Sequence, residues 1–184
     1  MAIQTFKWSL DRYHAAISNG LIQADDRLEL LRGDLIVMSP EGEPHAYYSS
    51  EIGDYLRRSL GNRAKIRENH PITLPNDSEP EPDIAVVQPL GQEYLSHHPY
   101  PENIFWLIEF SQSSLEKDLD LKKAIYAEAN IQEYWVVSLT PAKLYVFRNP
   151  VQADYTSKLI LTVGTISPLS FPELQIEVQR CMNV

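Results

Sequence analysis

FWLIEFSQSSLEKDLDLKKAIYAEANIQEYWVVSL, residues Phe105–Leu139, is the stretch that decides the fold. It contains an apolar run over 105–110, a helix-forming segment over 115–129 and a second apolar run over 133–139. A strand, a helix and a strand joined by short loops form a parallel crossover. Glu109 interrupts the first apolar run, and a buried carboxylate is costly unless a cation or a metal pairs with it. The stretch therefore predicts a sheet that carries a site.

The chain on either side of this unit supplies further strands and helices. Helical spacing of apolar residues predicts helices over 10–19 and 44–60, and a glycine between two apolar runs predicts a hairpin over 27–38. Further strands are expected over 64–74, 84–87, 143–148 and 157–162, with an edge strand over 171–178. This order predicts an α/β fold in which a central mixed sheet is flanked by helices, preceded by an N-terminal helix and hairpin. We expect residues 1–184 to form a single domain.

Composition excludes several classes of protein. The 184 residues carry a formal net charge of -9, and the isoelectric point is about 5.0. Non-specific binding to nucleic acid or to an anionic membrane needs a basic surface, which this chain lacks overall. The single cysteine, Cys181, excludes a disulfide framework within one chain. With no signal-peptide pattern and no apolar run near ~18 residues, we expect a cytoplasmic protein that does not bind a membrane.

Two carboxylates mark the candidate site. Asp83 opens the predicted strand over 84–87, and Glu109 lies in the strand that follows it along the chain. If these strands are neighbours, both carboxylates point to one side of the sheet and repel each other. A hard divalent cation such as Mg²⁺ removes that conflict. In the alternative, Asp83 caps a turn and Glu109 pairs with a cation such as Lys122.

The predicted helix carries the candidate cation. Asp118, Lys122 and Tyr126 are spaced four apart and therefore share one face. Leu115 and Leu119 lie on or beside that face, so it points toward the sheet, where Lys122 would reach Glu109 and a substrate phosphate. In the alternative, Asp118 and Lys122 form a solvent-exposed pair of little energetic value.

Six motifs occur in a fixed order along the chain. They are Glu29-Leu30-Leu31 before Gly33, Ser39-Pro40 before His45, Glu81-Pro82-Asp83, Glu109-Phe110-Ser111, the helix from Asp118 to Tyr126, and Glu133-Tyr134-Trp135. In this order and spacing, most of the chain resembles the Uma-two-type family of restriction endonucleases, which belongs to the PD-(D/E)xK nuclease superfamily. The resemblance implies a restriction-endonuclease-like core and a homodimer.

The resemblance also implies a function and the residues that perform it. The protein would be a metal-dependent endonuclease that hydrolyses phosphodiester bonds of DNA, with Mg²⁺ or Mn²⁺ as its cofactor. Asp83 and Glu109 would be metal ligands, with the backbone carbonyl of Phe110 as a third candidate. The superfamily pattern places a lysine two positions after the acidic residue, where this chain has Ser111. The catalytic lysine, which orients the attacking water and offsets phosphate charge, would therefore be Lys122.

Two other functions stay open. One is a catalytically inactive nuclease-fold protein used for binding or assembly, which the acidic net charge and Ser111 favour. The other is a metal-dependent hydrolase of a small phosphorylated substrate. The clustering of Asp83, Glu109 and Lys122 favours the endonuclease.

Several further residues are weaker candidates. Glu29 alternates with two leucines, which predicts an exposed strand position rather than a further acidic ligand. A lone histidine such as His45 is typical of a helix cap or a surface, and contact with substrate is the less favoured reading. A basic run could follow a phosphate backbone or be an ordinary solvated surface; it consists of Arg57, Arg58, Arg63, Lys65 and Arg67.

Overall fold

A six-stranded mixed sheet forms the centre of the molecule in the computed structural model, which describes residues 5–182. Its strands lie in the order β3-β4-β5-β6-β7-β8. Their bounds are Lys65–Glu68, Ile84–Val87, Ile104–Ser111, Glu133–Leu139, Ala142–Val151 and Asp154–Leu161. The neighbours β5 and β6 pair in parallel, whereas the other pairs in the sheet are antiparallel. The predicted mixed sheet is confirmed.

The parallel pair encloses the helical segment that the opening stretch predicts. This segment has three parts: α3 (Leu115–Lys117), the π-helical turn η5 (Asp118–Lys122) and α4 (Lys123–Glu128). The sequence predicts one regular helix, so the π turn is a difference; such turns frequently mark functional sites. Asn130 follows with φ of 61°, the left-handed conformation that ends many helices.

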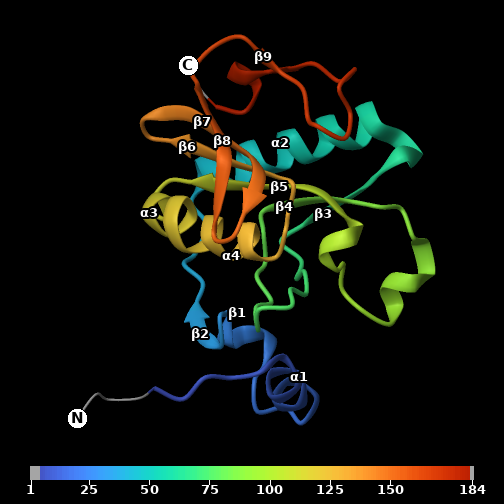
Figure 1. Cartoon of the computed structure of the whole chain (residues 1–184), viewed down its shortest axis with the longest axis vertical. Coiled ribbons are helices and arrows are strands. Elements are labelled where there is room, and N and C mark those ends of the chain that lie inside the picture. Colours follow the sequence, from blue (N-terminus) through green and yellow to red (C-terminus); the bar gives the residue numbers. More distant parts are fainter. Residues whose placement is uncertain (1–4, 183–184) are drawn as a thin grey trace.

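An N-terminal helix and a hairpin precede the sheet, as the sequence predicts. Helix α1 (Leu10–Ser18) begins after Ser9, whose side chain accepts a hydrogen bond from the Arg12 backbone. The hairpin strands β1 (Leu28–Leu31) and β2 (Asp34–Val37) are antiparallel. Figure 1 shows these elements together at the lower end of the molecule, away from the C-terminal segment.

The turn of this hairpin needs glycine for two reasons. Arg32 and Gly33 both have positive φ, at 48° and 77°, which two-residue hairpin turns favour. A Cβ at Gly33 would also lie 2.7 Å from the backbone oxygen of Trp8. Turn conformation and the close approach of the preceding chain therefore both exclude a side chain at this position.

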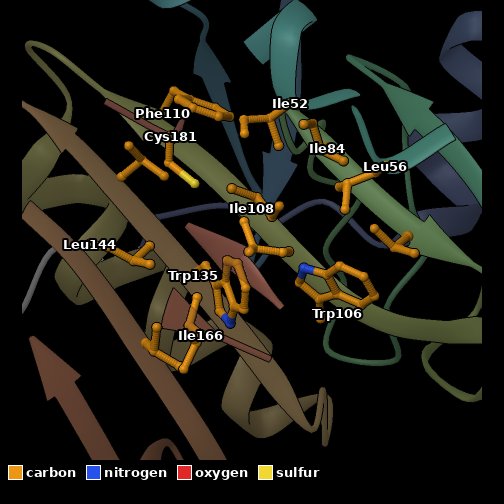
Figure 2. Close-up of a cluster of buried hydrophobic side chains, with 14 of the residues drawn as sticks. Ile52, Leu56, Ile84, Trp106, Ile108, Phe110, Trp135, Leu144, Ile166 and Cys181 are labelled. Carbon is orange, nitrogen blue, oxygen red and sulfur yellow. The ribbon is translucent and has the colours of Figure 1, made fainter. Parts of the chain in front are cut away.

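Helix α2 (Glu43–Leu60) covers one face of the sheet. Its Ile52 and Leu56 lie beside Ile84 and Ile108 of the central strands (Figure 2). Trp106 and Trp135 extend the same cluster along β5 and β6, and both are buried. Burial of such large side chains is the main favourable term that holds α2 on the sheet.

Helix α4 covers the opposite face. Ile125 and Tyr126 of α4 pack with Leu107 and Val136 of the sheet. Successive side chains of a strand point to opposite faces, so Glu109 lies on this face with Leu107. The alternation of β5 thus directs an acidic side chain toward the helical segment.

The C-terminal segment differs from its prediction. An edge strand over 171–178 is expected, but the structure has only β10 (Ile176–Glu177), which pairs with β9 (Thr165–Ile166) in a separate two-stranded sheet. Pro168 and Pro172 lie in this region and cannot donate ladder hydrogen bonds, which disfavours a longer strand. Among residues 64–74, likewise, β3 is the one strand of more than a single residue. Short 3₁₀ turns complete the fold: η1 (Ala24–Asp26), η2 (Gly61–Arg63), η3 (Gly91–Leu95), η4 (Pro101–Asn103) and η6 (Val178–Arg180).

Truncation of Leu56 should test the packing of α2 against the sheet. Leu56 is 0% exposed and Leu95 is 88% exposed. We expect Leu56→Ala to lower the free energy of unfolding by about 2–5 kcal/mol and the matched control Leu95→Ala to change it by less than about 0.5 kcal/mol. Urea unfolding followed by circular dichroism measures both. Equal stability of the two variants would contradict the packing of α2.

Alkylation of Cys181 should report on the docking of the C-terminal segment. Burial raises the pKa of the Cys181 thiol to about 12, and the thiolate is the reactive form. We expect iodoacetamide to leave the native protein unmodified at mildly alkaline pH and to modify it once urea unfolds the chain. Mass spectrometry gives the answer without ambiguity, because the chain has one cysteine. Rapid modification of the native protein would mean that the thiol is exposed and that the C-terminal segment is not docked on the core.

Candidate active site

Asp83, directly before β4, lies near Glu109 of the neighbouring strand β5. In the antiparallel pair β4–β5, Ile84 is opposite Ile108 and Ala85 is opposite Leu107. One further step along this register sets Asp83 opposite Glu109, and Cβ atoms of opposite residues lie about 4.5–5.5 Å apart. Both side chains line the same cavity. The structure thus brings together the two carboxylates that the sequence pairs.

The Asp83 carboxylate is bonded across the sheet rather than within a turn. Its Oδ2 accepts a hydrogen bond from the backbone N–H of Phe110 at 2.5 Å. The same oxygen lies 2.9 Å from Nε2 of His45, in the first turn of α2. The alternative in which Asp83 caps a local turn is therefore wrong. His45 belongs to the site, contrary to the more favoured expectation of a cap or surface residue.

Lys122 contacts Glu109, as the sequence predicts. Its Nζ donates to Oε1 of Glu109 at 2.9 Å, and the Tyr126 hydroxyl donates to the same oxygen at 2.8 Å. Glu109 is 3% exposed and Lys122 is 3% exposed. Among the described residues, the second oxygen of Glu109, Oε2, accepts no hydrogen bond. One oxygen of Glu109 is thus held by the helical segment while the other is left for the adjoining cavity.

Glu29 is a correction to the sequence analysis. It is expected at an exposed strand position, but it is 1% exposed and shares Lys122 with Glu109. Its Oε2 lies 3.3 Å from Nζ of Lys122, and its Oε1 accepts from Nζ of Lys117 at 3.0 Å. Strand β1 is covered on both sides, so alternation with leucine does not expose Glu29. The signal in the sequence was the same as for Glu109, a glutamate flanked by apolar strand residues.

Ser111 and Asp118 begin the helical segment. The Ser111 and Ser114 hydroxyls donate to Oδ2 of Asp118 at 2.5 Å and 2.6 Å. The Asp118 carbonyl accepts from the Tyr134 hydroxyl at 3.1 Å. Asp118 and Lys122 are both buried, so the alternative of an exposed Asp118–Lys122 pair is wrong. Ser111, at the position where the superfamily pattern has lysine, instead ties β5 to η5.

Burial and neighbouring charges of opposite sign act in opposing directions on the pKa of Glu109 and on that of Lys122. Burial raises the pKa of Glu109 above its ordinary value and the charge of Asp83 raises it further, although Lys122 acts in the opposite direction. Burial lowers the pKa of Lys122, but Glu109 and Glu29 together hold it well above its ordinary value. Lys122 therefore carries its proton. Burial and the charge of Asp83 disfavour the ionised form of Glu109.

One cavity of about 370 Å³ is lined by Glu29, Asp83, Glu109 and Lys122, together with Glu81 and Lys117. Burial and the charge of Glu29 raise the pKa of Glu81. Ligand atoms of Glu41, His45 and Asp83 all lie within 4.8 Å of one another. The Nδ1 atom of His45 is buried and has no hydrogen-bond partner among the described residues. Crowded carboxylates beside an unpartnered imidazole nitrogen form a donor set that fits a divalent cation.

The family model described as "Putative restriction endonuclease", Uma2, matches residues 10–179. The chain belongs to this family. The resemblance found in the sequence is thereby confirmed. No curated protein matches the chain.

Among solved structures, this Uma2-family chain is similar to the crystal structure of "a putative nuclease belonging to DUF820" from Anabaena variabilis. The TM-score is 0.72 at 17% sequence identity, and the match covers 94% of this chain and 96% of that chain. An identity this low shows that the two proteins share a fold. The family match supports a nuclease.

The basic run of the Uma2-family chain is largely paired with acids. Arg57 contacts Asp54 at 3.0 Å and also Glu68, and Arg63 pairs with Glu173. Within residues 5–182, Lys65 forms no ion pair. These ion pairs offset much of the positive charge of the run. In the same part of the chain, no helix has the length and apolar character needed to cross a bilayer.

Removal of the Lys122 ammonium should destabilise the fold. Lys122→Met leaves Glu29 and Glu109 buried without their shared cation, and loss of one partner from a buried ion pair costs about 3–5 kcal/mol. The matched control is Lys123→Met, which removes a pair with the exposed Asp154 and should cost about 0–1 kcal/mol. Urea unfolding measures both variants. Adding Glu109→Gln to Lys122→Met should restore part of the loss, and identical stabilities of the two single variants would refute the role assigned to Lys122.

Proposed function

We propose that this protein is a metal-dependent endonuclease that hydrolyses phosphodiester bonds, with DNA as its substrate. The observation that carries the proposal is the placement of Asp83 next to Glu109 at one end of β4 and β5, with Lys122 bonded to Glu109. All three side chains line one cavity. Membership of the Uma2 family supports the same activity.

Asp83 and Glu109 are the proposed ligands of Mg²⁺ or Mn²⁺. Such an ion, when bound, supplies Lewis-acid polarisation of the phosphate and a more acidic water. The chain's own part is to fix the two carboxylates: the Phe110 backbone N–H holds Asp83, and Lys122 with Tyr126 holds Glu109. Oε2 of Glu109 stays free for the ion. A role for the Phe110 carbonyl as third ligand remains a prediction.

Lys122 is the proposed catalytic lysine. Its positive charge lies beside Glu109, where it offsets negative charge on a phosphate brought to the same carboxylate. Lys117 extends this positive charge toward the opening, because its side chain is 31% exposed and lines the same cavity. Together the two lysines compensate the acidic site for an anionic substrate. As the family resemblance implies, we also propose that the protein acts as a homodimer.

A second candidate function is binding or assembly without catalysis. The observation that favours it is Ser111, which stands at the usual lysine position and donates its hydroxyl to Asp118. Lys122 is also already paired with two carboxylates, those of Glu29 and Glu109. A protein with this function would bind nucleic acid and leave it uncut.

Cleavage of supercoiled plasmid DNA tests the proposal. We expect nicking with Mn²⁺ or Mg²⁺, none with a chelator, and a loss of roughly 100-fold in Asp83→Asn, which corresponds to about 2.7 kcal/mol of transition-state stabilisation. The matched control is Asp25→Asn, a substitution at an exposed residue outside the cavity, and it should cut like the wild type. Equal cutting by Asp83→Asn would identify a contaminating nuclease. DNA binding without cutting would favour the second candidate function.

A further inference from the structure

Two side chains near Asp83 have no part in the mechanism above. Glu41 lies in the loop before α2, and His45 lies in the first turn of that helix. Their side chains are 34% and 12% exposed, and that of Asp83 is 13% exposed. The start of α2 thus places a carboxylate and an imidazole against one of the proposed metal ligands. The two residues come from a different part of the chain than Asp83 and Glu109.

The imidazole of His45 lies between two carboxylates. Its Nε2 is 2.9 Å from Oδ2 of Asp83, and its Nδ1 is 3.7 Å from Oε2 of Glu41. A neutral imidazole carries one proton, so one of its two nitrogens presents a lone pair to the neighbouring carboxylate. Two acceptors then face each other beside a largely buried ring, which is unfavourable unless a cation or a proton lies between them.

The spacing suits a metal ion. Metal–nitrogen and metal–oxygen bonds are about 2.1 Å long, so two ligand atoms of one ion lie up to about 4.2 Å apart. The ligand atoms of Glu41, His45 and Asp83 lie within 4.8 Å of one another. Glu41 is the most exposed of the three, so its side chain can make the remaining adjustment. His45 is held more firmly, because its ring packs edge-on against Phe110 with 6.2 Å between ring centroids.

We propose that Glu41 and His45 complete a cation site with Asp83, and that the imidazole nitrogen makes this site select a first-row transition metal ion over Mg²⁺. The inference rests on the proposed function only in that both use Asp83. Mg²⁺ binds oxygen ligands and keeps much of its water shell, whereas imidazole is a favoured ligand of transition metals. A site of one nitrogen and two carboxylates therefore binds Mn²⁺ more tightly than Mg²⁺. The ion chosen as probe is Mn²⁺.

A simple ion pair is the competing explanation. A second proton on the ring would also separate the two acceptors, giving an imidazolium flanked by Glu41 and Asp83. The burial of His45 lowers its pKa, but the hydrogen bond and charge of Asp83 raise it above the ordinary value overall. An imidazolium of this kind would leave Mn²⁺ affinity independent of His45, so metal binding separates the two explanations.

Calorimetric titration of the full chain with MnCl₂ and with MgCl₂ is the first test. We expect Mn²⁺ to bind at least about tenfold more tightly than Mg²⁺, and His45→Gln to weaken Mn²⁺ binding by about 10–100-fold with little effect on Mg²⁺. Glu41→Gln, in an exposed loop position, should weaken Mn²⁺ binding without risk to the fold. The matched control is His70→Gln at an exposed histidine outside the cavity, which should bind Mn²⁺ like the wild type.

Pulsed electron paramagnetic resonance of the Mn²⁺-loaded protein is the second test. Nitrogen hyperfine coupling from a coordinated imidazole should be present in the wild type and in His70→Gln and absent in His45→Gln. No coupling in the wild type, or equal Mn²⁺ affinity of wild type and His45→Gln, overturns the inference and leaves the ion pair. Neither measurement uses DNA, so metal binding through His45 in a protein that cuts nothing would refute the endonuclease alone.

Discussion

The ammonium group of Lys122 is the interaction on which the rest of the site depends. It lies 2.9 Å from Glu109 of β5 and 3.3 Å from Glu29 of β1, and all three side chains are buried. Charges are tolerated in such a position only when they pair closely. The hairpin, the sheet and η5 must therefore all be in place for any one of these charges to be stable. One cation couples the N-terminal part of the fold to its centre.

The same interaction explains how a serine can stand where the nuclease pattern has lysine. With Ser111 at this position, β5 does not carry the lysine of the nuclease pattern. The Ser111 hydroxyl instead donates to Asp118 at the start of η5. Four residues later in the chain, Lys122 returns a positive charge to Glu109 from the helical side. In this chain the positive charge beside the acidic residue therefore comes from the helical segment. Burial then makes that charge a structural requirement as well as a catalytic candidate.

Both faces of the sheet contribute to the cavity. Helix α2 packs on one face and delivers His45 to Asp83, and the helical segment on the other face delivers Lys122 to Glu109. The two helical elements lie on either side of the sheet (Figure 1), and Asp83 and Glu109 lie at one end of the neighbouring strands β4 and β5. A site assembled in this way combines oxygen and nitrogen donors on one side with fixed positive charge on the other. That division suits a metal ion and an anionic substrate held side by side.

Sequence by itself determined the order of the elements, the parallel crossover, and the pairing of Asp83 with Glu109 and of Glu109 with Lys122. These follow from periodicity and from strands and helices that are near neighbours along the chain. Only the tertiary structure decided that Glu29 is buried on Lys117, 88 positions away, and that His45 meets Asp83, 38 positions away. The covering of β1 and the docking of the C-terminal segment likewise depend on surfaces that exist only after folding. Local patterns fix which face a side chain takes, whereas its partner across the fold depends on how whole elements pack.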